Sequence, residues 1–161
     1  MALLRTARRA IASIGEVTVE RMEHVGIVVD DLAAAIAFFS ELGLELQGTT
    51  AAEGTWVDRV VGLEGVQVDV AMLETPDGQG RIELAAFRAP RFTDGEQHAP
   101  ANAWGIRHVA FRVDDIAAVV ERLSRHGATL VGAIETFEDI YRLCYVRGPA
   151  GIIVELAERI G

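Results

Sequence analysis

The chain has 161 residues, of which 50% are hydrophobic, and a formal net charge of −9. This length suits one compact domain or two small fused units. No apolar run approaches the roughly 20 residues that span a bilayer. The negative net charge argues against nucleic acid or an anionic membrane as the main partner. The basic residues are all arginine and Cys144 is the only cysteine, which excludes lysine Schiff-base chemistry, an intrachain disulfide and a cysteine-rich zinc cluster.

The first segment, residues 1–20, lies outside the regular patterns that follow. Residues 1–15 carry arginines but no acidic residue, and their apolar residues are spaced for one helical face. We therefore predict an N-terminal helical arm that packs on the body or on a partner subunit, with an organelle transit peptide as the alternative. A helical arm and a lone cysteine are consistent with the cytoplasmic location that we expect.

The first predicted module covers residues 21–88 and begins with a strand at 22–29. Its alternating pattern places His24 on the face opposite Val25, Ile27 and Val29. A helix follows, because a carboxylate that can cap its start and a glycine that can end it flank a stripe of apolar residues. The cap is Asp30 or Asp31, the terminator is Gly43, and the stripe comprises Leu32, Ala35, Ile36 and Phe39.

Three more strands complete the module, at residues 44–49, 66–73 and 80–87. Residues 50–65, which include Trp56, are predicted to be an irregular insertion over the sheet. In the last strand, Glu83 alternates with apolar neighbours that face the helix, so it is expected to share the face of His24. The module therefore has the order strand, helix, strand, strand, strand.

Residues 89–104 contain two prolines and a glycine and are predicted to be a linker. The second module, residues 105–161, repeats the order of the first. Its strand at 106–113 places His108, Ala110 and Arg112 opposite the large apolar residues. The remaining elements are a helix at 115–126, with Ile116, Val119, Val120 and Leu123 as its stripe, and strands near 129–134, 140–147 and 151–157, the last of which carries Glu155.

One segment occurs twice, because residues 24–46 align without a gap with residues 108–130. The repeat carries His24 onto His108, and each half ends in a strand with one glutamate, Glu83 or Glu155. Two imidazoles and two carboxylates at equivalent places indicate a metal site built by duplication. Such donors suit Zn²⁺, Ni²⁺, Co²⁺, Mn²⁺ or Fe²⁺, and their spacing does not select one of these ions.

The repeated segments resemble the vicinal oxygen chelate superfamily, which includes glyoxalase I, methylmalonyl-CoA epimerase, extradiol dioxygenases, and fosfomycin and bleomycin resistance proteins. The markers are His-Val-Gly-Ile-Val-Val-Asp-Asp, Glu-Leu-Gly-Leu, Ile-Glu-Leu, His-Val-Ala-Phe-Arg-Val-Asp-Asp and Gly-Pro-Ala-Gly-Ile-Ile-Val-Glu-Leu, and the resemblance covers about residues 21–158. It implies an α+β fold of two tandem βαβββ modules that form a curved mixed sheet. The helices would cover the convex side, and a metal cleft would lie on the concave side.

The resemblance also implies a function. Members place metal ligands on the first and last strands of each module, which gives His24, Glu83, His108 and Glu155. This set is closest to metal-dependent glyoxalase I, and it implies a lyase or isomerase that removes a proton next to a metal-chelated carbonyl, with Glu155 and Glu83 as ligands and as base or acid. The alternatives are a methylmalonyl-CoA epimerase-like enzyme, an extradiol dioxygenase and a non-enzymatic drug-binding resistance protein. A homodimer is expected, and the ligands can come from one chain or from two.

Four further residues are candidates for binding a small-molecule substrate. Arg112 faces the predicted cleft, where a guanidinium can hold a carboxylate or phosphate, or it lies along the sheet edge. Phe87 and Trp104 can form an apolar wall of the cleft, or belong to the core. Tyr145 can donate a hydrogen bond to a bound oxyanion. Cys144 has the opposite parity and is predicted to be a small core residue.

Overall fold

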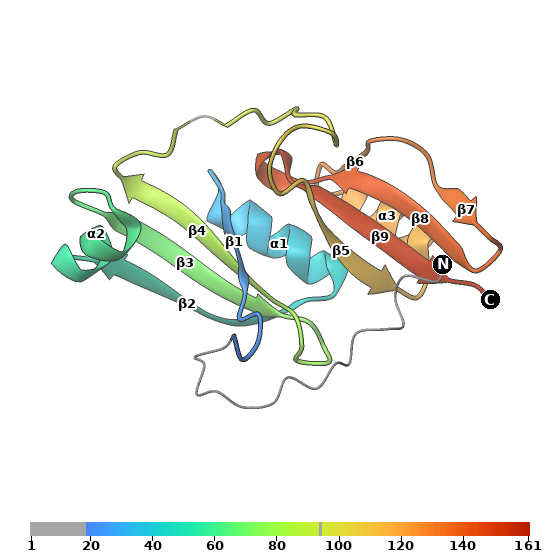
Figure 1. Cartoon of the computed structure of the whole chain (residues 1–161), viewed down its shortest axis with the longest axis horizontal. Helices are drawn as coiled ribbons and strands as arrows, with labels where there is room; N and C mark the ends of the chain where they lie inside the picture. Colours follow the sequence, from blue (N-terminus) through green and yellow to red (C-terminus); the bar gives the residue numbers. More distant parts are fainter. Residues whose placement is uncertain (1–18, 94) are drawn as a thin grey trace, which may run out of the picture.

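The computed structural model describes residues 19–93 and 95–161, which form two modules lying side by side (Figure 1). The predicted helical arm falls on residues 1–20, so all but its last two residues lie outside the described part of the chain. Among the described helices, none has the length and apolar character that crossing a bilayer requires.

The first module contains four strands that form one sheet in the order β1-β4-β3-β2. Strand β1 runs parallel to β4, and the other neighbours are antiparallel. Its elements are β1 (Val25–Val28), α1 (Leu32–Leu42), β2 (Glu45–Glu53), α2 (Thr55–Val61), β3 (Gln67–Glu74) and β4 (Arg81–Ala89).

The second module repeats this plan in the order β5-β9-β8-β6, with β7 also paired to β8. Its elements are β5 (His108–Val113), α3 (Ile116–Ser124), β6 (Thr129–Leu130), β7 (Glu135–Phe137), β8 (Tyr141–Arg147), the 3₁₀ turn η1 (Pro149–Gly151) and β9 (Ile153–Arg159). The predicted α+β fold with two tandem modules is confirmed. The described strands form two sheets instead of one, because the edge strands β1 and β5 flank a cavity and do not pair with each other.

The first main helix begins and ends for the reasons that the sequence suggests, and the second begins in the same way. The Asp31 side chain accepts a hydrogen bond from the backbone N–H of Ala34 at 2.9 Å, and Asp115 accepts one from Ala118 at 3.0 Å, so each carboxylate satisfies a free amide of the first turn. Gly43 ends α1 with φ 117°, a conformation that side chains disfavour. Both helices pack on one side of the strands, behind them in Figure 1, which leaves the other face of each sheet open.

Two segments differ from the prediction. Residues 50–65 are not irregular, because β2 continues to Glu53 and α2 follows. The short helix has no visible apolar stripe, since Val57 alone is buried and its other apolar residues are exposed. The prediction of one strand over residues 129–134 is also wrong. Strand β6 ends at Leu130, and the chain bends before β7 pairs with β8. The secondary structure of both segments therefore depends on tertiary contacts and not on the local sequence pattern.

The two modules share one hydrophobic core, which includes both long helices and the inner faces of both sheets. Phe38 is fully buried although it lies outside the predicted helical stripe. Its ring meets Phe39 edge-on, with ring centroids 5.1 Å apart, and it abuts Gly148 of the second module, where an added Cβ would lie 2.8 Å from the Phe38 Cζ. The face of α1 that carries Phe38 is therefore buried by the other module.

Candidate metal-binding pairs on the open faces

The second module brings His108 and Glu155 together on its open face. His108 is the first residue of β5, and Glu155 lies on the parallel neighbour β9. The imidazole Nε2 and the carboxylate Oε2 are 3.0 Å apart, and the two side chains are 38% and 22% exposed. Both groups are thus reachable by a small molecule or an ion while their backbones are fixed by the sheet.

Tyr145 completes this group from strand β8, where it lies directly opposite Glu155. Its hydroxyl is 3.5 Å from the His108 Nδ1, and the two rings are 5.1 Å apart between centroids. The preceding residue, Cys144, lies on the other face of β8 and is buried in the core as predicted. Burial, with a smaller effect of the Glu155 charge, raises the pKa of the Cys144 thiol to about 11, so the thiol stays protonated and is a poor ligand or nucleophile.

The first module repeats the same arrangement with His24 and Glu83. His24 directly precedes β1, and Glu83 lies on the parallel neighbour β4. Their Nε2 and Oε2 atoms are 4.0 Å apart. In both modules the residue two positions after the histidine pairs with the glutamate: Gly26 with Glu83, and Ala110 with Glu155. The sequence duplication is therefore also a duplication of side-chain geometry.

An ion-pair network holds the segment that carries His24, which has no strand pairing of its own. Arg81 on β4 donates from Nη1 to Glu23 at 2.9 Å and from Nε to Glu74 at 3.1 Å. Arg21 also donates to the Glu23 carboxylate, at 2.7 Å. The hydrogen bonds and charges of Arg21 and then Arg81 lower the pKa of Glu23. Arg81 thus ties the residue before His24 to the strand that carries Glu83.

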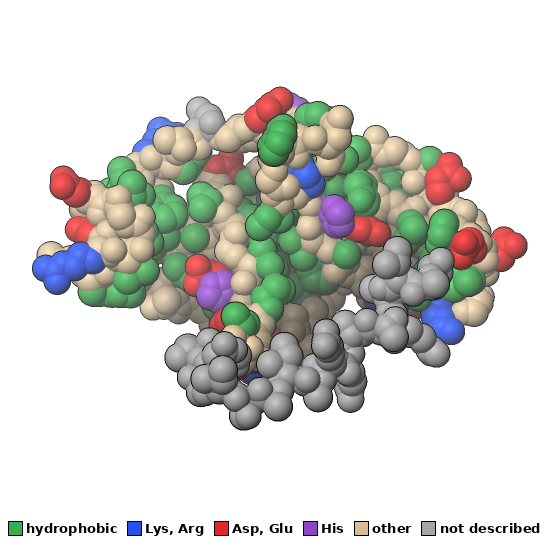
Figure 2. All heavy atoms as spheres, in the orientation of Figure 1, with side chains coloured by type: hydrophobic (Ala, Val, Ile, Leu, Met, Phe, Trp, Pro, Cys, Tyr) green, Lys and Arg blue, Asp and Glu red, His purple; other side chains and the backbone are tan. Residues whose placement is uncertain are grey.

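The two pairs remain separate within one chain. Over residues 19–93 and 95–161, no group of three or more His, Cys, Asp or Glu side chains is placed to hold one metal ion. Figure 2 shows two places near the middle of the view, separate from each other, where a histidine lies beside acidic side chains. Metal sites in proteins normally use three or four protein ligands, and each pair by itself supplies two donors, half of a four-ligand set.

The donor chemistry of each half fits a divalent ion. Two ligand atoms that both lie about 2.1 Å from a metal are about 3.0–3.4 Å apart. The His108–Glu155 separation of 3.0 Å falls in this range, whereas the His24–Glu83 separation of 4.0 Å is longer, so His24 and Glu83 would have to move closer together to share an ion. The sequence-predicted ligands are therefore brought together as two pairs, and within the described residues neither pair has a further His, Cys, Asp or Glu side chain placed to complete a metal site.

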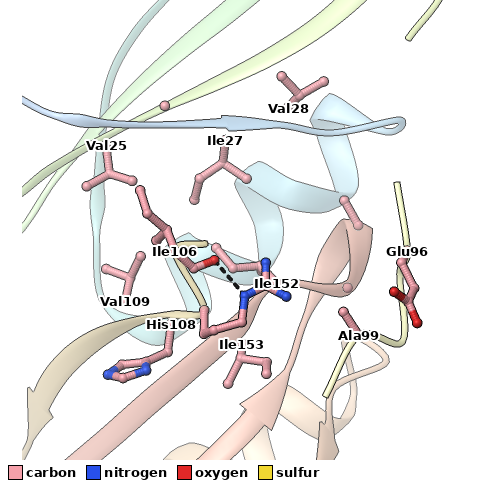
Figure 3. Close-up of a pocket in the computed structure, with 14 residues that line it drawn as sticks. Val25, Ile27, Val28, Glu96, Ala99, Ile106, His108, Val109, Ile152 and Ile153 are labelled. Carbon is pink, nitrogen blue, oxygen red and sulfur yellow. Dashed lines mark hydrogen bonds between the residues drawn. The ribbon is translucent and has the colours of Figure 1, made fainter. Parts of the chain in front are cut away.

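A cavity of about 280 Å³ lies between the two edge strands β1 and β5. Figure 3 shows Val25, Ile27, Val109 and Ile152 around it. His108 also lines this cavity, but its imidazole points away from these apolar side chains (Figure 3). The cavity separates the edges of the two sheets and carries one of the four predicted ligands.

The other predicted substrate-binding residues are dispersed. Arg112 lies on the open face of β5 and lines a different cavity, of about 620 Å³, beside the turn that joins β3 and β4. Phe87 is half-buried on the open face of β4, in contact with a small apolar cluster. Trp104 is fully exposed, at 101% of the reference area, so it contributes neither to the core nor to a wall of the cleft. Tyr145 is the one candidate in contact with a predicted ligand.

Sequence reasoning missed two features of the site. The Arg81 network was not anticipated, because the partners Glu23 and Glu74 lie in different elements and form no motif. The packing of α2 on the small apolar cluster was also missed, because residues 50–65 were predicted to be irregular. The alternation of β4 was the available signal for this cluster, since it places Phe87 on the same face as Glu83.

Comparison with known proteins agrees with this architecture. The sequence profile described as glyoxalase/bleomycin resistance protein/dioxygenase superfamily matches residues 23–145. A crystal structure of a glyoxalase family protein from Bacillus cereus is 46% identical, with a TM-score of 0.88 over 92% of this chain and 100% of that one. The uncharacterized protein YwbC of Bacillus subtilis is 31% identical over 87% of this chain and 98% of its own length.

The fold is shared more widely. The fosfomycin resistance protein FosX from Listeria monocytogenes, in a complex with Mn(II) and dihydroxypropylphosphonic acid, is 15% identical. Its TM-score is 0.59, and the match covers 89% of this chain and 92% of that one. At this identity the likeness is one of fold. From the profile match, the B. cereus structure and the duplicated modules, the chain belongs to the glyoxalase/bleomycin resistance protein/dioxygenase superfamily.

Proposed function

We propose that this protein is a divalent-metal-dependent lyase or isomerase whose metal centres are each completed by two copies of the chain. The superfamily includes many metalloenzymes, together with non-enzymatic resistance proteins. The observation that carries the proposal is the pair of half-sites, each with one imidazole and one carboxylate in the same register. The Mn(II) complex of FosX supports a divalent ion as the cofactor in this fold.

The exposed sheet edges support a homodimer. Strands β1 and β5 each have one hydrogen-bonded neighbour, and unpaired strand edges readily pair with another chain. Apolar side chains are exposed beside both edges, notably Val28 and Ile106. If β1 of one copy lies along β5 of the other, a two-fold axis creates two equivalent interfaces. His24 and Glu83 of one copy would then face His108 and Glu155 of the other.

In this arrangement the four residues would hold one Zn²⁺, Ni²⁺, Co²⁺, Mn²⁺ or Fe²⁺ ion. The bound ion would supply the Lewis acid that acidifies a C–H next to a carbonyl. The Glu155 carboxylate is partly exposed on the open face and can accept that proton and return it to the neighbouring atom of the substrate, and Glu83 can do the same from the other side. The Tyr145 hydroxyl beside His108 can donate a hydrogen bond to a negatively charged substrate oxygen.

Mixed dimers test the shared centre. Chains with His24→Ala and chains with His108→Ala are expected to lose the metal when each forms a homodimer. A purified mixed dimer would have one doubly altered site and one intact site, so it should bind half of the wild-type metal at wild-type affinity. Elemental mass spectrometry of the protein loaded with Zn²⁺ or Mn²⁺ measures the number of metal ions bound per dimer. A mixed dimer with no high-affinity metal would show that the ligands do not come from two chains.

Arg81→Gln is expected to weaken metal binding without touching the metal. The change removes the donor that ties Glu23 to β4, so His24 loses its fixed position. Loss of residues that orient a ligand typically lowers metal affinity about 10–100-fold. Competition with a fluorescent chelator measures the affinity. Arg21→Gln is the control, because Arg21 contacts Glu23 but is itself largely exposed, and an equal effect of both substitutions would contradict the role of Arg81.

A further inference from the structure

An apolar strip adjoins the His24–Glu83 pair on the open face of the first sheet. Met72 on β3 lies opposite Glu83 in the strand register, Val70 lies opposite Ala85, and Val68 lies opposite Phe87. Successive pairs on one face therefore carry only apolar side chains after Glu83. Met72, Val70 and Phe87 remain partly exposed, so the strip is open to a ligand next to the carboxylate.

Helix α2 closes the far end of this strip. Its buried residue Val57 packs on Val66, Val68 and Ala85, in a cluster separate from the shared core. The Asp58 carboxylate fixes the helix to the following chain, because it accepts hydrogen bonds from the backbone N–H groups of residues 65 and 66 at 3.1 and 2.7 Å. The strip thus has a carboxylate at one end and an anchored apolar cap at the other.

The second module lacks this feature. In residues 105–161, all of which the structure describes, no helix lies between β6 and β8. Tyr145 stands opposite Glu155, where the first module has Met72 opposite Glu83. Further along the open face, Arg112 lies beside Ala157. The duplicated pairs are therefore alike, but only apolar side chains follow Glu83 along the first sheet, whereas Tyr145 and Arg112 accompany Glu155 on the second.

We propose that the first module binds a hydrocarbon or aromatic group of the substrate along this strip, while the second module binds its polar oxygen-bearing part. This inference rests on the proposed function, because it places the reacting oxygens at the His and Glu pairs. Helix α2 covers the strip from Ala85, two residues beyond Glu83, which leaves about 7 Å of open strand at roughly 3.3 Å per residue. The strip therefore accommodates an unbranched chain of several carbons, and α2 sets its maximum length.

Hydroxamic acids test the inference, because they offer two neighbouring oxygens to a metal and carry a tail of any length. The metal-loaded protein is titrated with acetohydroxamic, butanohydroxamic, hexanohydroxamic, octanohydroxamic and dodecanohydroxamic acid. Affinity is expected to rise about fourfold for each buried methylene, and to stop rising once the tail reaches α2. Equal affinity along the series would overturn the apolar strip, whereas failure of the metal-loaded protein to bind any member would instead contradict the proposed function.

Matched variants locate the tail. Val70→Asp places a charge in the strip and should remove the gain from the longer tails while leaving acetohydroxamic acid binding unchanged. Leu143→Asp is the control, since Leu143 is an equally half-buried residue of the open face in the second module. Unchanged acetohydroxamic acid binding also shows that each variant is folded. If Leu143→Asp removes the gain and Val70→Asp does not, the tail lies on the second module and the inference is wrong.

Discussion

Glu155→Gln is expected to lower turnover by about 10²–10⁴-fold, the usual contribution of a general acid or base. The Glu155 carboxylate is 3.0 Å from the His108 imidazole and partly exposed, and in the proposed function it is the group that accepts a proton of the substrate. The amide keeps the shape of the side chain, but it is neutral and accepts a proton poorly. Isomerisation of a hemithioacetal of a 2-oxoaldehyde, together with deuterium uptake from solvent, measures the loss.

Glu158→Gln is the matched control for this result, because it makes the same change on the same strand. The Glu158 carboxylate accepts a hydrogen bond from the Ile116 N–H at the start of α3 and pairs with Arg142, so it acts on stability and has no contact with the paired ligands. Its turnover should stay near the wild-type value. If the Glu155→Gln variant keeps more than a tenth of the wild-type turnover at saturating metal, the Glu155 carboxylate does not act as the acid or base of the reaction.

Phe38→Ala is expected to destabilise the protein by about 3–5 kcal/mol, the range for removal of a buried aromatic ring. The ring is fully buried, meets Phe39 edge-on and fills the space beside Gly148 of the second module. Its loss opens a cavity between the modules that neither helix can close alone. Urea denaturation followed by fluorescence and by circular dichroism gives the change in the free energy of unfolding.

Two comparisons make this result specific. Phe137→Ala, at a half-exposed position of β7, should change stability by less than about 0.5–1 kcal/mol. Gly148→Ala should destabilise the wild type, because the new Cβ would lie 2.8 Å from the Phe38 ring, and it should do so far less when Phe38 is already alanine. Separate unfolding transitions for the two modules would contradict the shared core.

The local sequence pattern was sufficient to predict the helices and strands whose apolar residues recur at regular helical or strand spacing. The two long helices, a cap at Asp30 or Asp31 for the first of them, and the facing of His24 and His108 were predictable, because capping and strand alternation depend on neighbours in the sequence. Pattern failed at α2, where one buried valine anchors a helix whose other apolar residues are exposed. It also failed at Phe38, whose burial depends on a turn in the other module.

The sequence by itself determined the two modules, the four candidate ligands and the face on which they lie, since a duplicated alternating pattern repeats its geometry wherever it folds. The tertiary structure alone decided that the ligands form two separate pairs in one chain, because β1 and β5 stay apart as unpaired edges. It also decided that one pair adjoins apolar side chains and the other a tyrosine. These outcomes depend on which strands become neighbours, and strand neighbours are chosen by packing across the whole chain.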